Sequence, residues 1–147
     1  MRMTARVKGI LNIKVVDKNT NRVVSCERLE NDLHQAFAED LANTLVGTSG
    51  YAVGKIDKVT LYDTGNAYIK DLTPPTTLEC LSYSDHYEAH AVFEDSSSDE
   101  YTVGLVDLIA VRDSVSRIVA FKSGLSVTKT ADQKLIVDWT IAVYFTP

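Results

Sequence analysis

The sequence is poor in the residues that build metal centres and disulfide frameworks: its 147 residues include two cysteines, three histidines and one tryptophan. Cys26 and Cys80 stand in no CxxC or other metal-binding spacing. We predict that both are small buried residues within extended segments. A disulfide between them stays open, because nothing in the sequence brings their Cα atoms together.

Long apolar runs and an excess of positive charge are also missing. No run approaches the ~18 apolar residues that cross a bilayer, and the N-terminal stretch around Arg2 and Arg6 lacks the apolar region of a secretory signal peptide. The net charge of −5 argues against binding to duplex DNA. We therefore expect one domain over residues 1–147 with no signal peptide, no membrane contact and no direct nucleic-acid binding.

Motifs of common enzymes are absent as well. The chain contains neither GxGxxG nor a P-loop, and Ser114 and Ser116 lack the G-x-S-x-G frame of a nucleophilic serine. Acidic residues are scattered at predicted turns instead of standing in pairs that suit general acid and base chemistry. The sequence therefore predicts a protein without catalytic residues or a cofactor.

The clearest pattern present is the closing segment 134–145, KLIVDWTIAVYF. Apolar residues occupy every second position, which predicts a β-strand with one buried face. These residues are Leu135, Val137, Trp139, Ile141, Val143 and Phe145. We expect Trp139 in the core, with Leu135, Val137 and Ile141 beside it.

Other segments also indicate strands. They are 5–16, 22–29, 55–62, 77–93, 101–112 and 117–125. In segment 101–112 the apolar residues change from odd to even positions around Asp107, which indicates a bulge or burial on both faces. Strands joined by short polar turns predict a mainly β fold: an antiparallel β-sandwich or partly closed barrel of seven to eight strands with one packed helix.

The predicted helix covers about residues 31–46. Asn31 suits its N-cap, and Gly47 suits a left-handed C-cap. Apolar residues recur at three- and four-residue spacing, which makes a stripe that includes Phe37 and Leu41. We expect both of these residues in the core.

His86, Glu88 and His90 form the one group that suggests a metal site. On a strand all three would project from one face at ~7 Å spacing, and on a helix the two histidines could share a zinc ion. His34 is the only other histidine in the sequence. A polar strand face is the simpler interpretation, and a metal-dependent enzyme built on these residues is a remote alternative.

The acidic run 95–100, DSSSDE, suggests either a solvated hairpin loop or a calcium site. It lacks the glycine and the spaced acidic residues of a dedicated calcium loop, so we expect the hairpin loop. If Tyr83 and Tyr87 lay next to this run, the protein would suit carbohydrate or receptor binding, which is the first alternative function.

Tyrosines outside the expected core suggest protein contacts. Tyr51, Tyr62 and Tyr68 fall near predicted loops, and Tyr144 falls on the outward parity of the closing strand. We expect these four residues at an interface.

Several segments, in their order along the chain, resemble a family of small structural proteins of tailed bacterial and archaeal viruses. The predicted helix, NDLHQAFAEDLANTLVG, resembles a family helix that begins with Asn and ends in Gly. Segment 56–62, the Gly65 turn, and segments 101–108 and 117–121 resemble further family strands. The closing motif is the most specific: VTKT at 127–130 followed by residues 135–145 resembles "(I/V)-T-K-T … L-x-(V/I)-x-W-T-I-x-(V/I)-x-F".

The resemblance covers residues 10–145 and departs from the family at its "E-x-G-L" signature, where this chain has Gly104, Leu105 and Asp107. It implies a non-enzymatic virion component of the tail, neck, baseplate or capsid surface. It also implies that the partners are other copies of the chain and other virion proteins. No catalytic residues, metal or cofactor follow from it.

Overall fold

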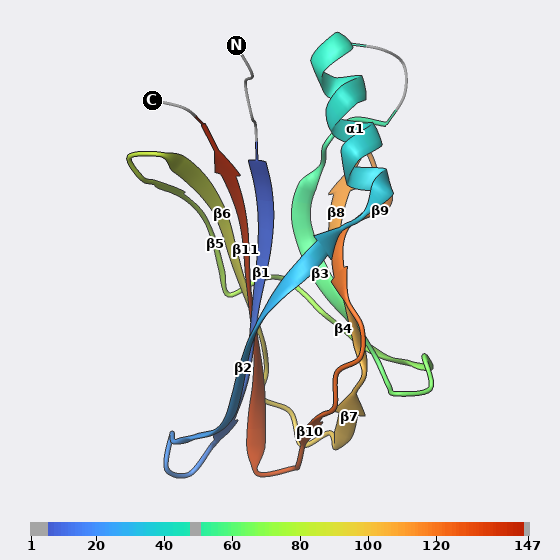
Figure 1. Cartoon of the computed structure of the whole chain (residues 1–147). Coiled ribbons are helices and arrows are strands. Elements are labelled where there is room, and N and C mark those ends of the chain that lie inside the picture. The colour runs from blue at the N-terminus through green and yellow to red at the C-terminus, as the bar shows by residue number, and fades with distance from the viewer. Residues whose placement is uncertain (1–5, 48–50, 146–147) are drawn as a thin grey trace.

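The computed structural model describes residues 6–47 and 51–145, so Arg2 lies outside the described residues. Within these ranges the protein is mainly β, with one helix and eleven strands where the sequence predicted seven to eight (Figure 1). The helix is α1 (Gln35–Val46). The strands are β1 (Arg6–Asp17), β2 (Val23–Leu33), β3 (Lys55–Tyr62), β4 (Tyr68–Leu72), β5 (Thr77–Ser82), β6 (His86–Asp95), β7 (Tyr101–Val103), β8 (Leu105–Arg112), β9 (Val115–Lys122), β10 (Val127–Lys129) and β11 (Gln133–Tyr144).

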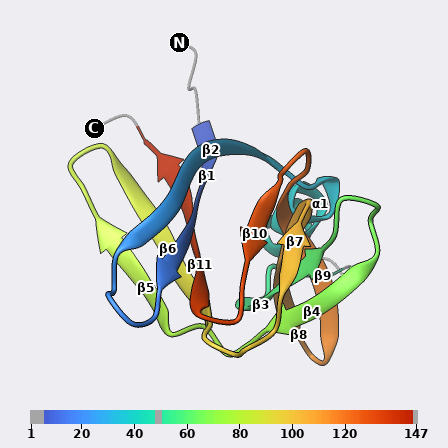
Figure 2. The same cartoon turned by 90° about the horizontal axis from the view of Figure 1, so that it is seen from below.

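The described strands form antiparallel sheets of five, four and two strands, and none of these sheets closes on itself. The five-stranded sheet has the order β2-β1-β11-β6-β5, and the four-stranded sheet has the order β4-β3-β8-β9. The end of β2 joins them, since Asp32 and Leu33 pair with Phe121 and Ala120 of β9. Figure 2 shows the small β7–β10 pair between the two larger sheets at one end of the molecule.

One hydrophobic core lies between the two larger sheets. Trp139, Leu135 and Val137 are fully buried there and Ile141 nearly so, as the alternation in the closing strand predicts. The prediction fails for Val143 and Phe145, which are exposed. The two larger sheets diverge toward the end of the molecule where β11 finishes (Figure 1), so no described strand faces the end of β11.

Two predicted strands each divide into two. Segment 77–93 breaks into the β5–β6 hairpin, and segment 101–112 breaks at Gly104, where a Cβ would lie 2.6 Å from the Thr64 Cα. The parity shift at Asp107 has both predicted causes. Asp107, Leu108 and their neighbours on β8 are buried on both faces, and the β8–β9 register shifts directly after Leu108.

The helix starts four residues later than predicted. His34 is its N-cap, with Nδ1 accepting a hydrogen bond from the Ala36 amide at 3.0 Å. Asn31 instead belongs to β2, and its Oδ1 accepts a hydrogen bond from Trp139 Nε1 at 3.0 Å. The predicted C-cap is confirmed, because Gly47 has a φ of 67°.

The expected apolar stripe accounts for only part of the helix packing. Phe37 contacts the core as predicted, but Leu41 is 37% exposed, so its core assignment is wrong. The helix is held by a polar contact: Asp40 is buried and accepts hydrogen bonds from Arg117 of β9, at 3.0 Å from Nη2. The upper half of α1 stands beyond the sheets (Figure 1), and Leu45 and Val46 near its end are exposed. No described helix has both the length and the apolar character of a membrane span.

Candidate interaction surfaces

The histidines proposed as metal ligands share one face of β6, as their spacing predicts, but they do not converge. Four residues along a strand place the Cα atoms of His86 and His90 about 13 Å apart. The ring of His90 lies between two carboxylates, with Nδ1 2.9 Å from Glu79 and Nε2 2.8 Å from Asp138. Among the described residues, no three His, Cys, Asp or Glu side chains are grouped as a metal site.

Both histidines instead connect strands on the outer face of the five-stranded sheet. Glu79 belongs to β5 and Asp138 to β11, so His90 bridges the two strands that flank β6. Burial lowers the pKa of His90, but the two carboxylates outweigh burial and raise it. The ring of His86 is stacked between Tyr83 and Tyr144, with centroid distances of 4.5 and 4.6 Å. A hydrogen bond with Asp85 raises the pKa of His86.

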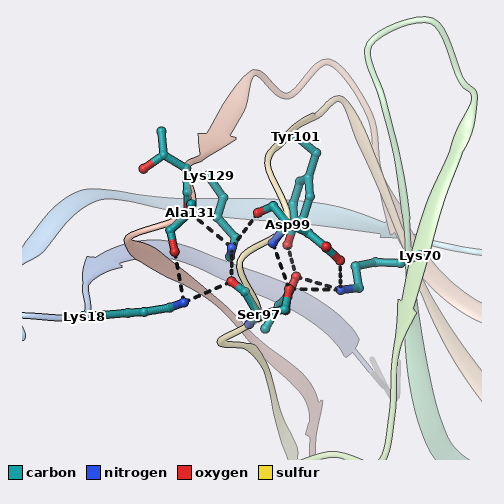
Figure 3. A network of polar contacts seen from close by, with 9 residues as sticks. Lys18, Lys70, Ser97, Asp99, Tyr101, Lys129 and Ala131 are labelled. Atoms are coloured by element: carbon teal, nitrogen blue, oxygen red, sulfur yellow. Dashed lines mark hydrogen bonds and ion pairs between the residues drawn. The ribbon is translucent and has the colours of Figure 1, made fainter.

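The acidic run 95–100 connects β6 of the five-stranded sheet to β7 of the two-stranded sheet, so it is not a hairpin loop. Its carboxylates face Lys70 of β4, whose Nζ lies 2.7 Å from Asp99 and 3.1 Å from Asp95 (Figure 3). Tyr101 donates a hydrogen bond to Asp95 at 2.6 Å. Although burial opposes it, the bonds from Tyr101, Ser97 and Lys70 hold the pKa of Asp95 far below its usual range.

Two further lysines bind the backbone of the same loop (Figure 3). Lys129 of β10 is fully buried and donates to the carbonyl oxygens of Ser97 and Asp99, both at 2.6 Å. Lys18, which follows β1, donates to Ser97 O at 3.1 Å and to Ala131 O at 3.0 Å. We call residues 95–100 the lysine-clamped loop, because ammonium groups occupy the oxygens that a calcium ion would need.

The composite carbohydrate site suggested by the sequence is not assembled. Tyr83 and Tyr87 lie beside the β5–β6 turn, and the lysine-clamped loop begins at the opposite end of β6. Ten residues of extended strand separate the two ends by about 30 Å. A single small glycan would not reach from the tyrosines to the acidic loop.

The four tyrosines expected at an interface lie in three separate places. Tyr51 covers Arg117, whose guanidinium carbon is 4.4 Å from the ring centroid. Tyr62 and Tyr68 contact each other edge to face at 6.3 Å, on β3 and β4. Tyr144 is half-buried beside His86. They do not form one patch.

An apolar cleft opens where the two sheets diverge, and no sequence pattern predicted it directly. Its volume is about 440 Å³, and its walls come from both large sheets and from α1. Residues that line it include Phe37, Ile56, Leu78, Tyr87, Val119 and Val143. The period-two pattern of β11 predicted burial for Val143, and that apolar position now marks one wall of the cleft.

A second surface is the outer edge of β2. One side of β2 pairs with β1 over most of its length, but the other side pairs with β9 only through Asp32 and Leu33. Residues 23–30, which we call the β2 edge, therefore have no strand on that side among the described residues. Residues 23–28 are all exposed, and Val23 and Val24 are each 56% exposed.

The cysteines belong to these open strands, so their predicted burial is wrong. Cys26 lies in the β2 edge and Cys80 lies in β5, the last strand of the five-stranded sheet, and both are free and exposed. The sheet faces explain the error. Cys26 lies opposite Lys14 of β1, on the face of the sheet turned away from the core, and Cys80 lines the open cleft.

Comparisons with protein-family models, curated proteins and solved structures found no match to this chain.

Proposed function

We propose that the protein is a non-enzymatic structural subunit of a tailed-type virus, which binds copies of itself and other virion proteins in the tail, neck or capsid surface. The proposal treats the two facing sheets as a β-sandwich. The resemblance in the sequence suggests the viral setting. The surface of the described chain supports a role in assembly.

The observation that carries the proposal is the apolar surface at the end where the cleft opens. Leu45 and Val46 of α1 are 79% and 70% exposed, and Val143, which lines the cleft, and Phe145, which follows β11, are exposed as well. Soluble monomers rarely leave apolar patches of this kind uncovered unless a partner binds there. A subunit that docks on a neighbour buries these side chains in the contact.

Nothing in the geometry favours the two alternatives suggested by the sequence. A carbohydrate-binding site required Tyr83 and Tyr87 to adjoin the acidic run, and these lie at opposite ends of β6. A metal-dependent enzyme required His86 and His90 to share an ion, and each ring is held instead by its own carboxylates. We therefore propose neither.

Quantitative mass spectrometry of purified particles tests the proposal. Particles of the virus whose genome encodes this chain should contain it at a fixed copy number that fits the symmetry of the tail, the neck or the capsid. The major tail and capsid proteins of the same particles calibrate the count. Absence of the chain from intact particles would show that the proposal is wrong.

A pair of variants tests whether the apolar end is the docking surface. Leu45→Glu places a charge on the exposed end of α1, and it should lower incorporation into particles while leaving the fold intact. Asn19→Glu adds the same charge at the exposed turn after β1, far along the chain from the cleft, and it should be incorporated normally. Equal incorporation of both variants would rule out this surface.

A further inference from the structure

We infer that two copies of this chain pair through their β2 edges, as antiparallel strands related by a two-fold axis that passes Cys26. The inference rests on the proposed function, because it names the contact by which a self-assembling subunit meets its first partner. It concerns a different surface from the apolar cleft, so the two can be tested separately.

The β2 edge is long and open. Eight residues of strand span about 27 Å, and their backbone groups on the outer side lack a partner strand within the described chain. Natural proteins commonly protect such edges with proline, bulges or charged side chains, lysine above all. Residues 23–30 contain neither proline nor lysine, and the charges that they carry, on Glu27, Arg28 and Glu30, are of both signs. The β1–β2 register shifts at Val24, and residues 25–30 follow as regular strand.

Symmetry restricts how two such edges can pair. Residues directly opposite each other in an antiparallel pair lie on the same face of the sheet, so a two-fold axis normal to the sheet must place one residue opposite its own copy. We call the residue that lies opposite its own copy the centre of the pairing. If Glu27 or Arg28 is the centre, two like charges stand opposite each other. If Ser25 is the centre, Arg22 stands opposite Arg28. If Leu29 is the centre, the partner strand runs into the position where β9 already pairs.

The centre at Cys26 avoids these conflicts. It places Ser25 opposite Glu27 twice, where the hydroxyl donates to the carboxylate. It also brings Arg22 of each copy to the end of the strand where the other copy carries Glu30. Opposite charges across strands stabilise the pair, and no like charges stand opposite each other in this register. Charge complementarity therefore selects a second copy of the same edge as the partner.

β5 is the competing open edge of the five-stranded sheet. It has six residues, and Pro74 and Pro75 precede it closely, which limits how far a partner strand can extend. Cys80 lies within β5 as Cys26 lies within the β2 edge. Each edge thus carries its own exposed thiol, and the chain offers a built-in control for which edge forms the contact.

Oxidative cross-linking of the purified chain tests the inference. Opposite residues in an antiparallel pair have Cα atoms about 4.5–5.5 Å apart, which falls within the range that a disulfide spans. Diamide should convert the wild type and Cys80→Ser to a covalent dimer on non-reducing gels. Cys26→Ser should give no covalent dimer, yet it should remain a dimer in light scattering, because the strand and not the thiol holds the contact.

A matched pair of charge variants tests the contact without oxidation. Cys26→Lys sets two ammonium groups opposite each other at the axis and should convert the dimer to monomer. Cys80→Lys makes the same charge change on the other exposed edge strand, where Cys80 lines the apolar cleft, and it should leave the β2 dimer unchanged. Circular dichroism establishes that both variants are folded, and sedimentation at concentrations up to about 100 µM, where mass action favours association, reports their mass.

Three results would overturn the inference: a wild-type monomer, cross-linking through Cys80 in the Cys26→Ser variant, or a Cys26→Lys variant that remains dimeric. None of these results bears on the copy number in virus particles. A chain found in particles but monomeric in solution refutes the β2 contact alone. A dimer through Cys26 in a chain absent from particles refutes the proposed virion role and leaves the contact itself established.

Discussion

The buried ammonium of Lys129 is the most demanding feature of this fold, and replacing Lys129 with methionine tests what it does. The side chain is fully buried, and its Nζ donates to the carbonyl oxygens of Ser97 and Asp99 at 2.6 Å and of Thr130 at 3.3 Å. Burial lowers the pKa of Lys129. Methionine has a similar length and fills the same space without a donor.

The cost of the substitution follows from which carbonyls lose their donor. Ser97 O keeps the hydrogen bond from Lys18, and Thr130 O keeps the hydrogen bond from the Gln133 amide at 3.1 Å. Asp99 O is therefore the oxygen that loses its donor. An unsatisfied buried group costs about 1–3 kcal/mol. Removal of a buried charge offsets part of this cost. We expect a net loss of about 1–2 kcal/mol in the free energy of unfolding.

Denaturant and thermal unfolding at neutral pH measure this loss. For a chain of this size we expect a fall of about 3–7 °C in Tm, together with faster amide hydrogen exchange in residues 97–101. Lys18→Met is the matched control: Lys18 is exposed and binds the same loop, so its loss should cost less than about 1 kcal/mol. A Lys129→Met variant as stable as the wild type would show that the lysine does not organise the loop.

Three further predictions concern the core, the helix and pH. Trp139→Ala should destabilise the protein by about 3–5 kcal/mol in denaturant melts, because it opens a cavity in a fully buried site; a loss under about 1 kcal/mol would contradict the core assignment. Arg117→Ala leaves the buried Asp40 without its cation and should lower the midpoint of denaturant unfolding, whereas Arg117→Ala with Asp40→Asn should recover part of the loss. The carboxylates around His90 raise its pKa, so its contribution to stability is complete below its unfolded pKa of about 6.5 and is lost as the pH rises through the folded value. His90→Gln should therefore flatten the fall in Tm above pH ~6.5, and an unchanged slope would contradict the bridge. The pKa of Asp95 is lowered, so the stability it adds is present above its unfolded pKa of about 3.9 and is lost as the solution is acidified.

Several local patterns were reliable where a residue's environment depends on its own element, although the N-cap predicted at Asn31 was wrong. The alternation in the closing segment predicted β11 and the burial of Trp139, because side chains on a strand alternate between two faces. Gly47 predicted the end of α1 because a left-handed cap needs a residue without a Cβ. The shift at Asp107 predicted both the bulge and the two-sided burial of β8, since either one breaks the alternation.

Predictions failed where burial depends on which element lies opposite. Leu41 and Val143 carry the correct periodicity for a core face, but their elements extend past the facing sheet and leave them exposed. Cys26 and Cys80 lie in strands that an extended pattern identifies correctly, but the pattern does not say which face the core covers: Cys26 lies on the outer face of its sheet, and Cys80 lines the open cleft. The pairing of Asp40 with Arg117 has no local signal in the sequence, because the two residues are 77 positions apart along the chain.

The sequence by itself determined the class of this protein: mainly β, with one helix and a closing strand whose apolar face builds the core. These features depend on periodicity and capping, which act over a few neighbouring residues. The tertiary structure decided which edges stay open, where the sheets diverge into a cleft, and which three lysines clamp the acidic loop. Lys18, Lys70 and Lys129 are spread over 112 positions, and only chain folding brings their ammonium groups to one loop (Figure 3).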